Sequence, residues 1–312
     1  MWKDFVDYLT YELWNLEGHL SNAINFFIYD TVKIFALLLT IIYLVTILRS
    51  YFPVEKARAF ISGKNRITGH ILAAIFGVIT PFCSCSAIPL FLGFLQARIP
   101  LGVTFSYLIS APLSDAVVIA LLLSLFGWKI ALLYVFVGLA IAIIAGLIIG
   151  SLNLEKEVLI EVKPIDVDYN EEVVTFKSRL KEAWEFTADI FNKIYIYVII
   201  GVGIGAFIHG YVPTDFITQY AGGDVWYAPI VAVIMGIPMY SNAAGILPLV
   251  EVLTSKGMLL GTALSFMMAV VALSLPEAMI LKRVLSVKLI SIFFGIVGFG
   301  ILIVGYLFNI IL

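Results

Sequence analysis

Apolar residues in this chain run in long blocks separated by short polar stretches. Four such blocks precede a polar segment, residues 152–189, and four follow it. A block of about 18 or more apolar residues is long enough to cross a bilayer as a helix. The pattern therefore predicts an all-α integral membrane protein with two halves of similar plan. The blocks span about residues 28–48, 69–97, 100–127, 130–151, 190–211, 226–255, 258–281 and 289–312.

Composition agrees with this pattern. Hydrophobic residues make up 62% of the 312 positions and charged residues 13%, and the mean hydropathy is +1.07. Soluble domains have about half apolar and about a quarter charged residues. The formal net charge is −2 and no basic tract is present, so no nucleic-acid partner is expected.

The first residues have a different pattern. Trp2, Phe5 and Leu9 recur at helical spacing opposite Asp4 and Asp7, which predicts an amphipathic helix lying in the membrane interface. The chain then divides into four parts. These are the interfacial helix (1–27), a first transmembrane repeat (28–151), a cytoplasmic linker (152–189) and a second transmembrane repeat (190–312).

Short matches between the two halves predict an internal repeat. The matches occur in the same order in both halves, although each is weak alone. Three pairs are 159 residues apart, an upstream set is 157 apart and a downstream set is 164 apart. The pairs are Pro89-Leu90 with Pro248-Leu249, Leu101-Gly102 with Leu260-Gly261, Ser106 with Ser265, then Pro81, Ser84 and Ala87 with Pro238, Ser241 and Ala244, and "SAP" at 110–112 with "SLP" at 274–276.

The second block of each half contains a turn in the middle. Pro81 and Pro238 should break these blocks into runs of about 13 residues, too short to span about 30 Å. Each block is therefore either a kinked spanning helix or a re-entrant hairpin. In the hairpin alternative each half has three spanning helices and one broken hairpin, and the halves are inverted; the other alternative is eight or more plain spanning helices. Helix breaks are expected at Pro81, Pro112, Pro238 and Pro276.

The distribution of Lys and Arg favours the hairpins. With hairpins, fifteen of these residues lie on one side of the membrane and four on the other, whereas plain spanning helices divide them ten to nine. Cytoplasmic loops are enriched in Lys and Arg, so the richer side is predicted to be cytoplasmic and both termini to lie outside.

Polar side chains gather at the two mid-block turns. Inverted repeats with broken helices are typical of secondary transporters, whose substrates bind near the bilayer midplane at the ends of half-helices. The turns are therefore the predicted substrate site, because interrupted backbone is tolerated there only where it lines a cavity or protein. The site residues are Cys83, Ser84, Cys85 and Ser86 in the first half and Tyr240, Ser241 and Asn242 in the second.

Two stretches resemble a known family. "TPFCSCSAIPLFLGFLQARIPLGVTFSYLISAP" is similar to the signature of the predicted permeases that include ArsP-type organoarsenical exporters, and "ALSLPEAMILKRVL" is similar to their second block. The resemblance covers the transmembrane chain. It implies a multi-spanning permease, and it implies for some members the efflux of trivalent organoarsenicals.

Cys83 and Cys85 are the only cysteines, and they suit a thiophilic substrate because thiolate is a soft ligand. Tyr240 and Asn242 occupy the matching positions of the second half, so a symmetric thiol cage is not expected. Three alternatives stay open. The cysteines could pack a helix crossing, a small anion or sulfur compound could bind at the half-helix N-termini, or a cysteine could act as nucleophile in an intramembrane thiol enzyme.

Asp115 and Glu277 are candidates for proton or ion coupling. Each lies in the third block of its half, after Pro112 or Pro276, and a carboxylate at membrane depth is costly unless it is protonated, paired or functional. For Glu277 the alternative is an interfacial ion pair with Lys282 or Arg283.

Little else in the sequence carries chemistry. The three histidines are dispersed and no nucleotide-binding motif is present, so neither a metal nor another cofactor nor an enzyme is expected. The expected partners are a small-molecule or ion substrate and the lipid bilayer, with an oligomer left open. The expected location is the plasma membrane, as a multi-pass protein.

Overall fold

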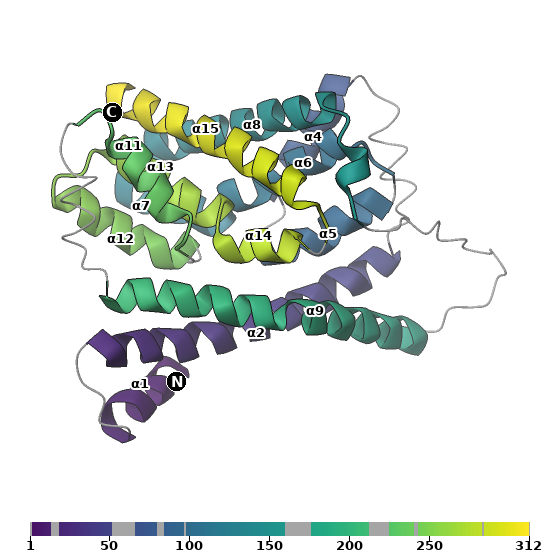
Figure 1. Ribbon diagram of the computed structural model, residues 1–312, viewed down its shortest axis with the longest axis horizontal. Coiled ribbons are helices and arrows are strands. Elements are labelled where there is room, and N and C mark those ends of the chain that lie inside the picture. The colour runs from purple at the N-terminus through teal and green to yellow at the C-terminus, as the bar shows by residue number, and fades with distance from the viewer. Residues whose placement is uncertain are drawn as a thin grey trace.

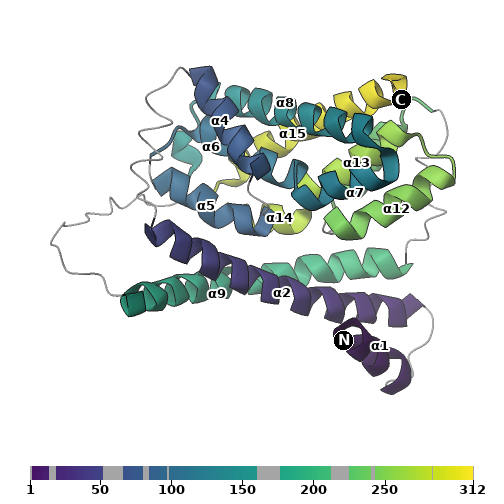
Figure 2. The same cartoon turned by 180° about the vertical axis from the view of Figure 1, so that it is seen from behind.

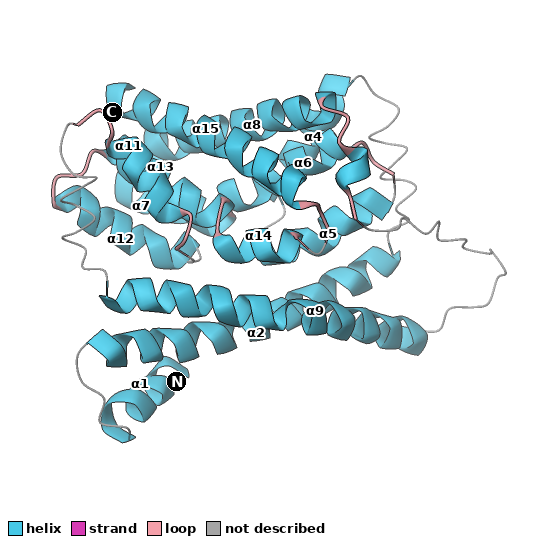
Figure 3. Ribbon diagram, in the orientation of Figure 1, coloured by secondary structure: helices cyan, strands magenta, loops and turns pink. Residues whose placement is uncertain are grey.

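The computed structural model describes a protein built of helices (Figure 3). The all-α prediction is confirmed for the described part of the chain, where the β-structure is one isolated bridge. The described residues are 2–13, 19–51, 66–79, 84–96, 98–159, 176–211, 225–239, 243–282 and 284–311.

The N-terminus is helical but interrupted. α1 (Trp2–Asp7) continues into a π-helical turn, Tyr8–Leu13, and α2 (His19–Tyr51) starts well before the expected position at about 28. The Asn25 amide donates a hydrogen bond of 2.8 Å to the Asp7 carboxylate, which ties α1 to α2. Figures 1 and 2 show α1 beyond α2, away from the main bundle. Its place in the membrane interface stays a prediction.

α2 lies alongside α9 (Phe176–Tyr211) as a layer beneath the other helices (Figures 1 and 2). The rings of Phe35 and Phe191 meet at 5.1 Å, and those of Tyr43 and Trp184 at 6.1 Å. Residue numbers rise along α2 as they fall along α9, so the two helices are antiparallel. α9 begins inside the segment expected to be a linker, because its amphipathic end and the following apolar block form one continuous helix.

The second block of each half contains two described helices. The first half has α4 (Arg66–Ile79) and α5 (Ser84–Gln96), and the second has α11 (Ala228–Gly236) and α12 (Ala243–Ser255). Pro238, where a break is predicted, lies in the turn after α11, and Pro81 falls outside the described residues. Both the kinked spanning helix and the re-entrant hairpin stay predictions for these blocks. α4 and α5 lie toward one end of the bundle, and α11 and α12 toward the opposite end (Figures 1 and 2).

The third block of each half is also interrupted, close to Pro112 and Pro276, where helix breaks are expected. α6 (Leu101–Leu113) is followed by α7 (Ala116–Phe126) at a bend of 45°, and α13 (Leu260–Ala272) by α14 (Leu275–Leu281). Pro112 lies in the last turn of α6, and Pro276 lies in the first turn of α14. Proline removes a backbone donor from a helix interior but is tolerated in a first turn, which agrees with both positions.

The fourth blocks form the long helices α8 (Trp128–Ser151) and α15 (Val287–Ile311). Among the described residues, three helical stretches are long and apolar enough to cross a membrane: α8, residues 260–281, and α15. A fourth is added if the bent pair α6–α7 is one span. Phe136 on α8 is 72% exposed and Phe299 on α15 is 66% exposed, as suits helices that face lipid. The protein is thus an integral membrane protein.

The two halves repeat one backbone plan at a constant offset. α5 begins at Ser84 and α12 at Ala243, an offset of 159 (243 minus 84), and the same offset separates α6 from α13 and α8 from α15. The residue after α6, Ser114, has φ −122° and ψ 35°, and the residue after α13, Leu273, has φ −130° and ψ 29°. Equivalent residues therefore end equivalent helices in the same conformation.

The constant offset corrects two of the sequence matches. A Cβ on Gly77 of α4 would lie 2.9 Å from the Ser110 Cβ, and a Cβ on Gly236 of α11 would lie 3.1 Å from the Ala269 Cβ. Both pairs are 159 residues apart, so the upstream offset of 157 is wrong. Because Ser110 corresponds to Ala269, the downstream offset of 164 is wrong as well.

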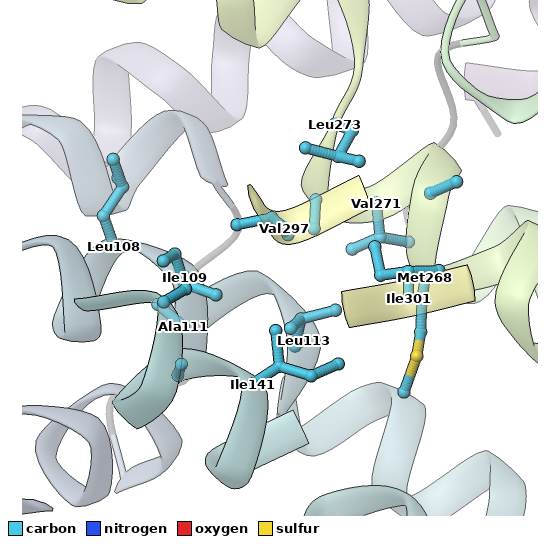
Figure 4. Packing of buried hydrophobic residues seen from close by; sticks show 14 of the residues in the cluster. Leu108, Ile109, Ala111, Leu113, Ile141, Met268, Val271, Leu273, Val297 and Ile301 are labelled. Atoms are coloured by element: carbon cyan, nitrogen blue, oxygen red, sulfur yellow. The ribbon is translucent and has the colours of Figure 1, made fainter. Parts of the chain in front are cut away.

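The core is formed by α6 and α13, which are buried along almost their whole lengths. Figure 4 shows Leu113 and Ile141 of the first half close to Met268 and Ile301 of the second. α4 is fastened to this core by polar contacts as well, since His70 Nδ1 lies 2.8 Å from the buried Ser106 hydroxyl of α6. The tightly packed centre is therefore shared by both halves.

Helix crossings in this core require glycine. A Cβ on Gly102 of α6 would collide with the Gly146 carbonyl oxygen of α8 and lie 2.7 Å from the Gly150 Cα. At the equivalent crossing a Cβ on Gly261 of α13 would lie 2.6 Å from the Gly305 carbonyl oxygen of α15. Small residues let membrane helices approach closely, and the repeat uses them at the same places in both halves.

The chain that leaves α8 is docked onto the connection between α14 and α15. Val158 and Leu285 form the isolated antiparallel bridge, and the Ser286 amide donates a hydrogen bond of 2.8 Å to the Glu157 carbonyl. Lys288 Nζ lies 3.2 Å from the Glu157 carboxylate. The end of the first half is therefore attached to the second half at the surface.

We expect Gly102→Ala to destabilise the protein. Alanine ordinarily stabilises a helix interior relative to glycine by about 0.5–1 kcal/mol, but overpacking a core costs about 1–3 kcal/mol. Gly295→Ala on α15 is the matched control, since nothing lies within 4 Å of a Cβ there. Thermal unfolding in detergent should show a lower midpoint for Gly102→Ala only. Equal midpoints for the two variants would contradict the close crossing.

The docking at Glu157 should depend on pH. Hydrogen bonds from Ser286 and Lys288 hold the pKa of Glu157 below its ordinary value. A group with a lowered pKa in the folded state stabilises it above the unfolded pKa, and this contribution disappears as the pH falls through the folded pKa. The unfolding midpoint of Glu157→Gln should therefore lie below wild type near neutral pH and converge with it in acid. Glu155→Gln, on an exposed neighbour, should follow wild type throughout.

Candidate functional site

The residues predicted to bind substrate lie directly before α5 and α12 or in the first turn of α5. Ser84, Cys85 and Ser86 form the first turn of α5, whose backbone the structure describes. The remaining predicted residues lie outside the described residues, immediately before α5 or α12: Pro81, Cys83, Tyr240, Ser241 and Asn242. Their role as a binding site stays a prediction.

The offset of 159 changes which residues correspond across the two turns. Cys83 corresponds to Asn242, and Cys85 corresponds to Ala244 in the first turn of α12. The earlier pairing of the cysteines with Tyr240 and Asn242 used the wrong offset. Both thiols still belong to the first half alone, so the two turns differ in chemistry although their helices match.

Each turn helix packs against a half-helix of the other half. α5 contacts α14, and α12 contacts α7. Figures 1 and 2 both show α5 beside α14 and α12 beside α7. The two halves are thus interlocked through these helices, and segments that are far apart in the sequence lie side by side.

Two helix breaks of the second half are joined by a backbone hydrogen bond. The Leu275 amide at the start of α14 donates to the Ile237 carbonyl in the turn after α11, at 3.1 Å. The prolines that follow these residues, Pro276 and Pro238, therefore belong to one junction. Interrupted backbone is satisfied here by protein, as a membrane interior requires.

Asp115 and Glu277 lie at the starts of two half-helices. Asp115 is partly buried and directly precedes α7, where its carbonyl accepts a hydrogen bond of 3.0 Å from the Ile119 amide. Glu277 lies in the first turn of α14 and is 3% exposed, whereas Lys282 at the end of that helix is exposed. Acidic residues at helix N-termini are stabilised by the helix dipole. The suggested partner Arg283 is outside the described residues.

The two carboxylates are not equivalent in the repeat. At the offset of 159, Asp115 corresponds to Ser274, and Glu277 corresponds to Val118, which is fully buried in α7. Each half therefore carries its own acid at a different position. α14, which carries Glu277, packs against α5 of the first half.

Sequence reasoning missed two polar residues near Asp115. Ser114 and Tyr134 are fully buried, and neither hydroxyl has a hydrogen-bond partner among the described residues. A correct repeat offset would have revealed them, because the equivalent positions hold the apolar residues Leu273 and Phe293. Within the described ranges, no three His, Cys, Asp or Glu side chains gather to hold a metal ion.

Comparison with known proteins identifies the family. The profile of a family described as predicted permease, ArsP_1, matches residues 19–310. The chain belongs to this predicted permease family. Its match confirms the resemblance found in the sequence, and it makes the protein a predicted membrane transporter rather than a member of an enzyme family.

Relatives of this predicted permease are distant. The UPF0718 protein MJ0584 of Methanocaldococcus jannaschii is 22% identical over 81% of this chain and 85% of its own length. The UPF0718 protein YcgR of Bacillus subtilis is 27% identical over 56% of this chain and 59% of its own. A putative two-component membrane permease complex subunit of Streptococcus mutans is 25% identical over 55% of this chain and 56% of its own length. No solved structure matches the chain.

We expect Glu277→Val to leave this permease folded and as stable as wild type or more so. Val118 occupies the equivalent buried position, and replacing a buried ionisable group by an apolar residue of fitting shape is often neutral or stabilising. Thermal unfolding in detergent measures this, with Val118→Ala as a control that should lower the midpoint by creating a cavity. Loss of folded Glu277→Val protein would show instead that the carboxylate holds the fold together.

Proposed function

We propose that this permease is a secondary transporter built of two inverted repeats. The support is the single offset of 159 that relates helix bounds, helix ends and glycine crossings across the halves. The two broken pairs, α4–α5 and α11–α12, lie toward opposite ends of the bundle, as two re-entrant hairpins of inverted halves would (Figures 1 and 2). Such repeats work by alternating access around a site at the midplane.

The observation that carries the proposal is the exchange of half-helices between the halves. α5 of the first half packs on α14 of the second, and α12 packs on α7. A site at the hairpin turns would therefore lie between the two repeats, where rocking of one against the other can expose it to each side in turn. This is the position that alternating access requires.

The proposed substrate is thiophilic, such as a trivalent organoarsenical, and is exported. Cys83 and Cys85 flank Ser84, the first residue of α5, and the positive end of a helix dipole favours thiolate, the form that binds soft centres. The hydroxyls of Ser84 and Ser86 would line the same turn. The opposite wall would be formed by Tyr240, Ser241 and Asn242 before α12.

A second candidate substrate is a small anion or sulfur compound. It is favoured by the second turn, which contains no thiol and where the first turn of α12, from Ala243, offers backbone N–H groups. On this alternative the two turns bind the same kind of group, and the thiols contribute only weak S–H donors. Retention of transport by a protein without cysteines would favour it.

Coupling is assigned to the two carboxylates, with an ion at Asp115 and a proton or ion at Glu277. Glu277 shares the α5–α14 wall with the proposed thiol site, so its charge can respond to the substrate. We place the protein in the plasma membrane as a multi-pass carrier. The Streptococcus mutans relative is named as a subunit of a permease complex. A partner protein that co-purifies with this chain should therefore be looked for.

The test is transport of a trivalent methylarsenical in everted vesicles. Vesicles with wild type should accumulate the compound. The accumulation rate of the double variant Cys83→Ser, Cys85→Ser should be lower by at least about tenfold, because serine is a poor ligand for a soft centre. Ser124→Ala, an exposed position on α7, is the control and should transport as wild type. Undiminished transport by folded double variant would exclude the thiol site, and no transport by wild type would exclude the arsenical substrate.

A further inference from the structure

Two buried hydroxyl groups at the break between α6 and α7 need an explanation. Ser114 and Tyr134 are both 0% exposed, and neither hydroxyl oxygen has a hydrogen-bond partner among the described residues. Burying a hydroxyl without a partner is costly, and native proteins rarely do so without a bound ion, a water or a function. The pair therefore points to a ligand.

Ser114 and Tyr134 lie at the same contact, between the α6–α7 break and α8. A Cβ on Gly138 of α8 would lie 3.4 Å from the Ser114 Oγ, so Ser114 points at α8 beside this glycine. Tyr134 is one helical turn before Gly138 and lies on the same face of α8. Asp115 follows Ser114 in the chain, and its carboxylate is close enough for its charge to act on the Tyr134 hydroxyl.

The second half shows that the fold does not need these polar groups. At the offset of 159, Ser114 corresponds to Leu273, Tyr134 to Phe293 and Gly138 to Val297. The three counterparts are buried as well, at 0%, 1% and 0% exposure. The same backbone is thus built with apolar side chains in one half, whereas the other half has two hydroxyls beside a glycine. The polar version is specific to the first half.

The chemistry of the group suits a small cation. The last carbonyl groups of α6 lack intrahelical partners and carry the negative end of its dipole. Together with the Asp115 carboxylate and the two hydroxyl oxygens, they offer only hard oxygen ligands and one full negative charge. One carboxylate balances a monovalent ion, and hard ions prefer oxygen. A proton would occupy the carboxylate alone and would leave two buried hydroxyls unexplained.

We propose that Ser114, Asp115 and Tyr134 form a sodium-ion site at the α6–α7 break. Interrupted helices of secondary transporters coordinate coupling ions with unwound carbonyls and helix C-terminal ends, which is the arrangement available here. The proposal deepens the coupling role of Asp115 and in that respect rests on the proposed function. The site lies on the half-helix pair whose second member, α7, packs against α12, so ion binding would act on the second turn.

Equilibrium binding of ²²Na⁺ to the purified full chain in detergent tests the site without any transported substrate. Wild type should bind about one ion per chain, and unlabelled Na⁺ but not K⁺ or choline should displace it. Asp115→Asn should abolish binding. Tyr134→Phe and Ser114→Ala, which each remove one oxygen, should weaken it about tenfold, a loss of about 1.4 kcal/mol. Ser124→Ala on α7 should bind as wild type.

Thermal unfolding provides the second readout. The midpoint of wild type should rise with NaCl and not with choline chloride, and the rise should be absent in Asp115→Asn. The unfolding midpoint of each variant without sodium shows whether that variant is folded. If Tyr134→Phe does not fold, Ser114→Ala alone tests the contribution of the hydroxyl groups. Equal effects of the salts, displacement by K⁺ as effective as by Na⁺, or wild-type binding by both hydroxyl variants would overturn the site.

The two proposals fail separately. Sodium binding without arsenical transport would leave the ion site intact and remove the substrate assignment. Arsenical transport by a wild-type protein that binds no sodium would retain the transporter and overturn the ion site.

Discussion

A helix that ends inside a membrane leaves backbone donors and acceptors that lipid cannot satisfy, so protein has to cover them. Three such interruptions lie within the described residues, after α6, α11 and α13, and the arrangement of the molecule follows from covering them. α6 and α13 are buried almost completely, and α8 and α15 flank them with their outer faces exposed. The Leu275–Ile237 hydrogen bond shows one break satisfying another directly.

This constraint also accounts for the glycines and the exchange of half-helices. Short helices such as α6 can be surrounded only if their neighbours approach closely, and Gly102 facing Gly146 allows that approach. The half-helices α7 and α14 then extend toward the other half and pack against its helices α12 and α5.

Equivalent backbones with unequal side chains give the molecule its chemistry. Both cysteines, Asp115 and the buried hydroxyls of Ser114 and Tyr134 belong to the first half, whereas the fully buried Val118 is replaced by Glu277 in the second. Packing alone does not require any of these polar groups, because the other half shows an apolar or small residue at most of the matching positions. The differences between the halves are therefore a better guide to function than the similarities.

The sequence by itself determined the helical membrane class and the family, because apolar block length and the cysteine motif are local signals. Two of its three repeat offsets were wrong, because short motifs match by chance at several spacings. Only the tertiary structure decided that Gly102 faces Gly146, that α5 packs on α14 and that Ser114 lies beside Tyr134's helix. Contacts between distant segments depend on which helix faces meet, and no local pattern of residues encodes that.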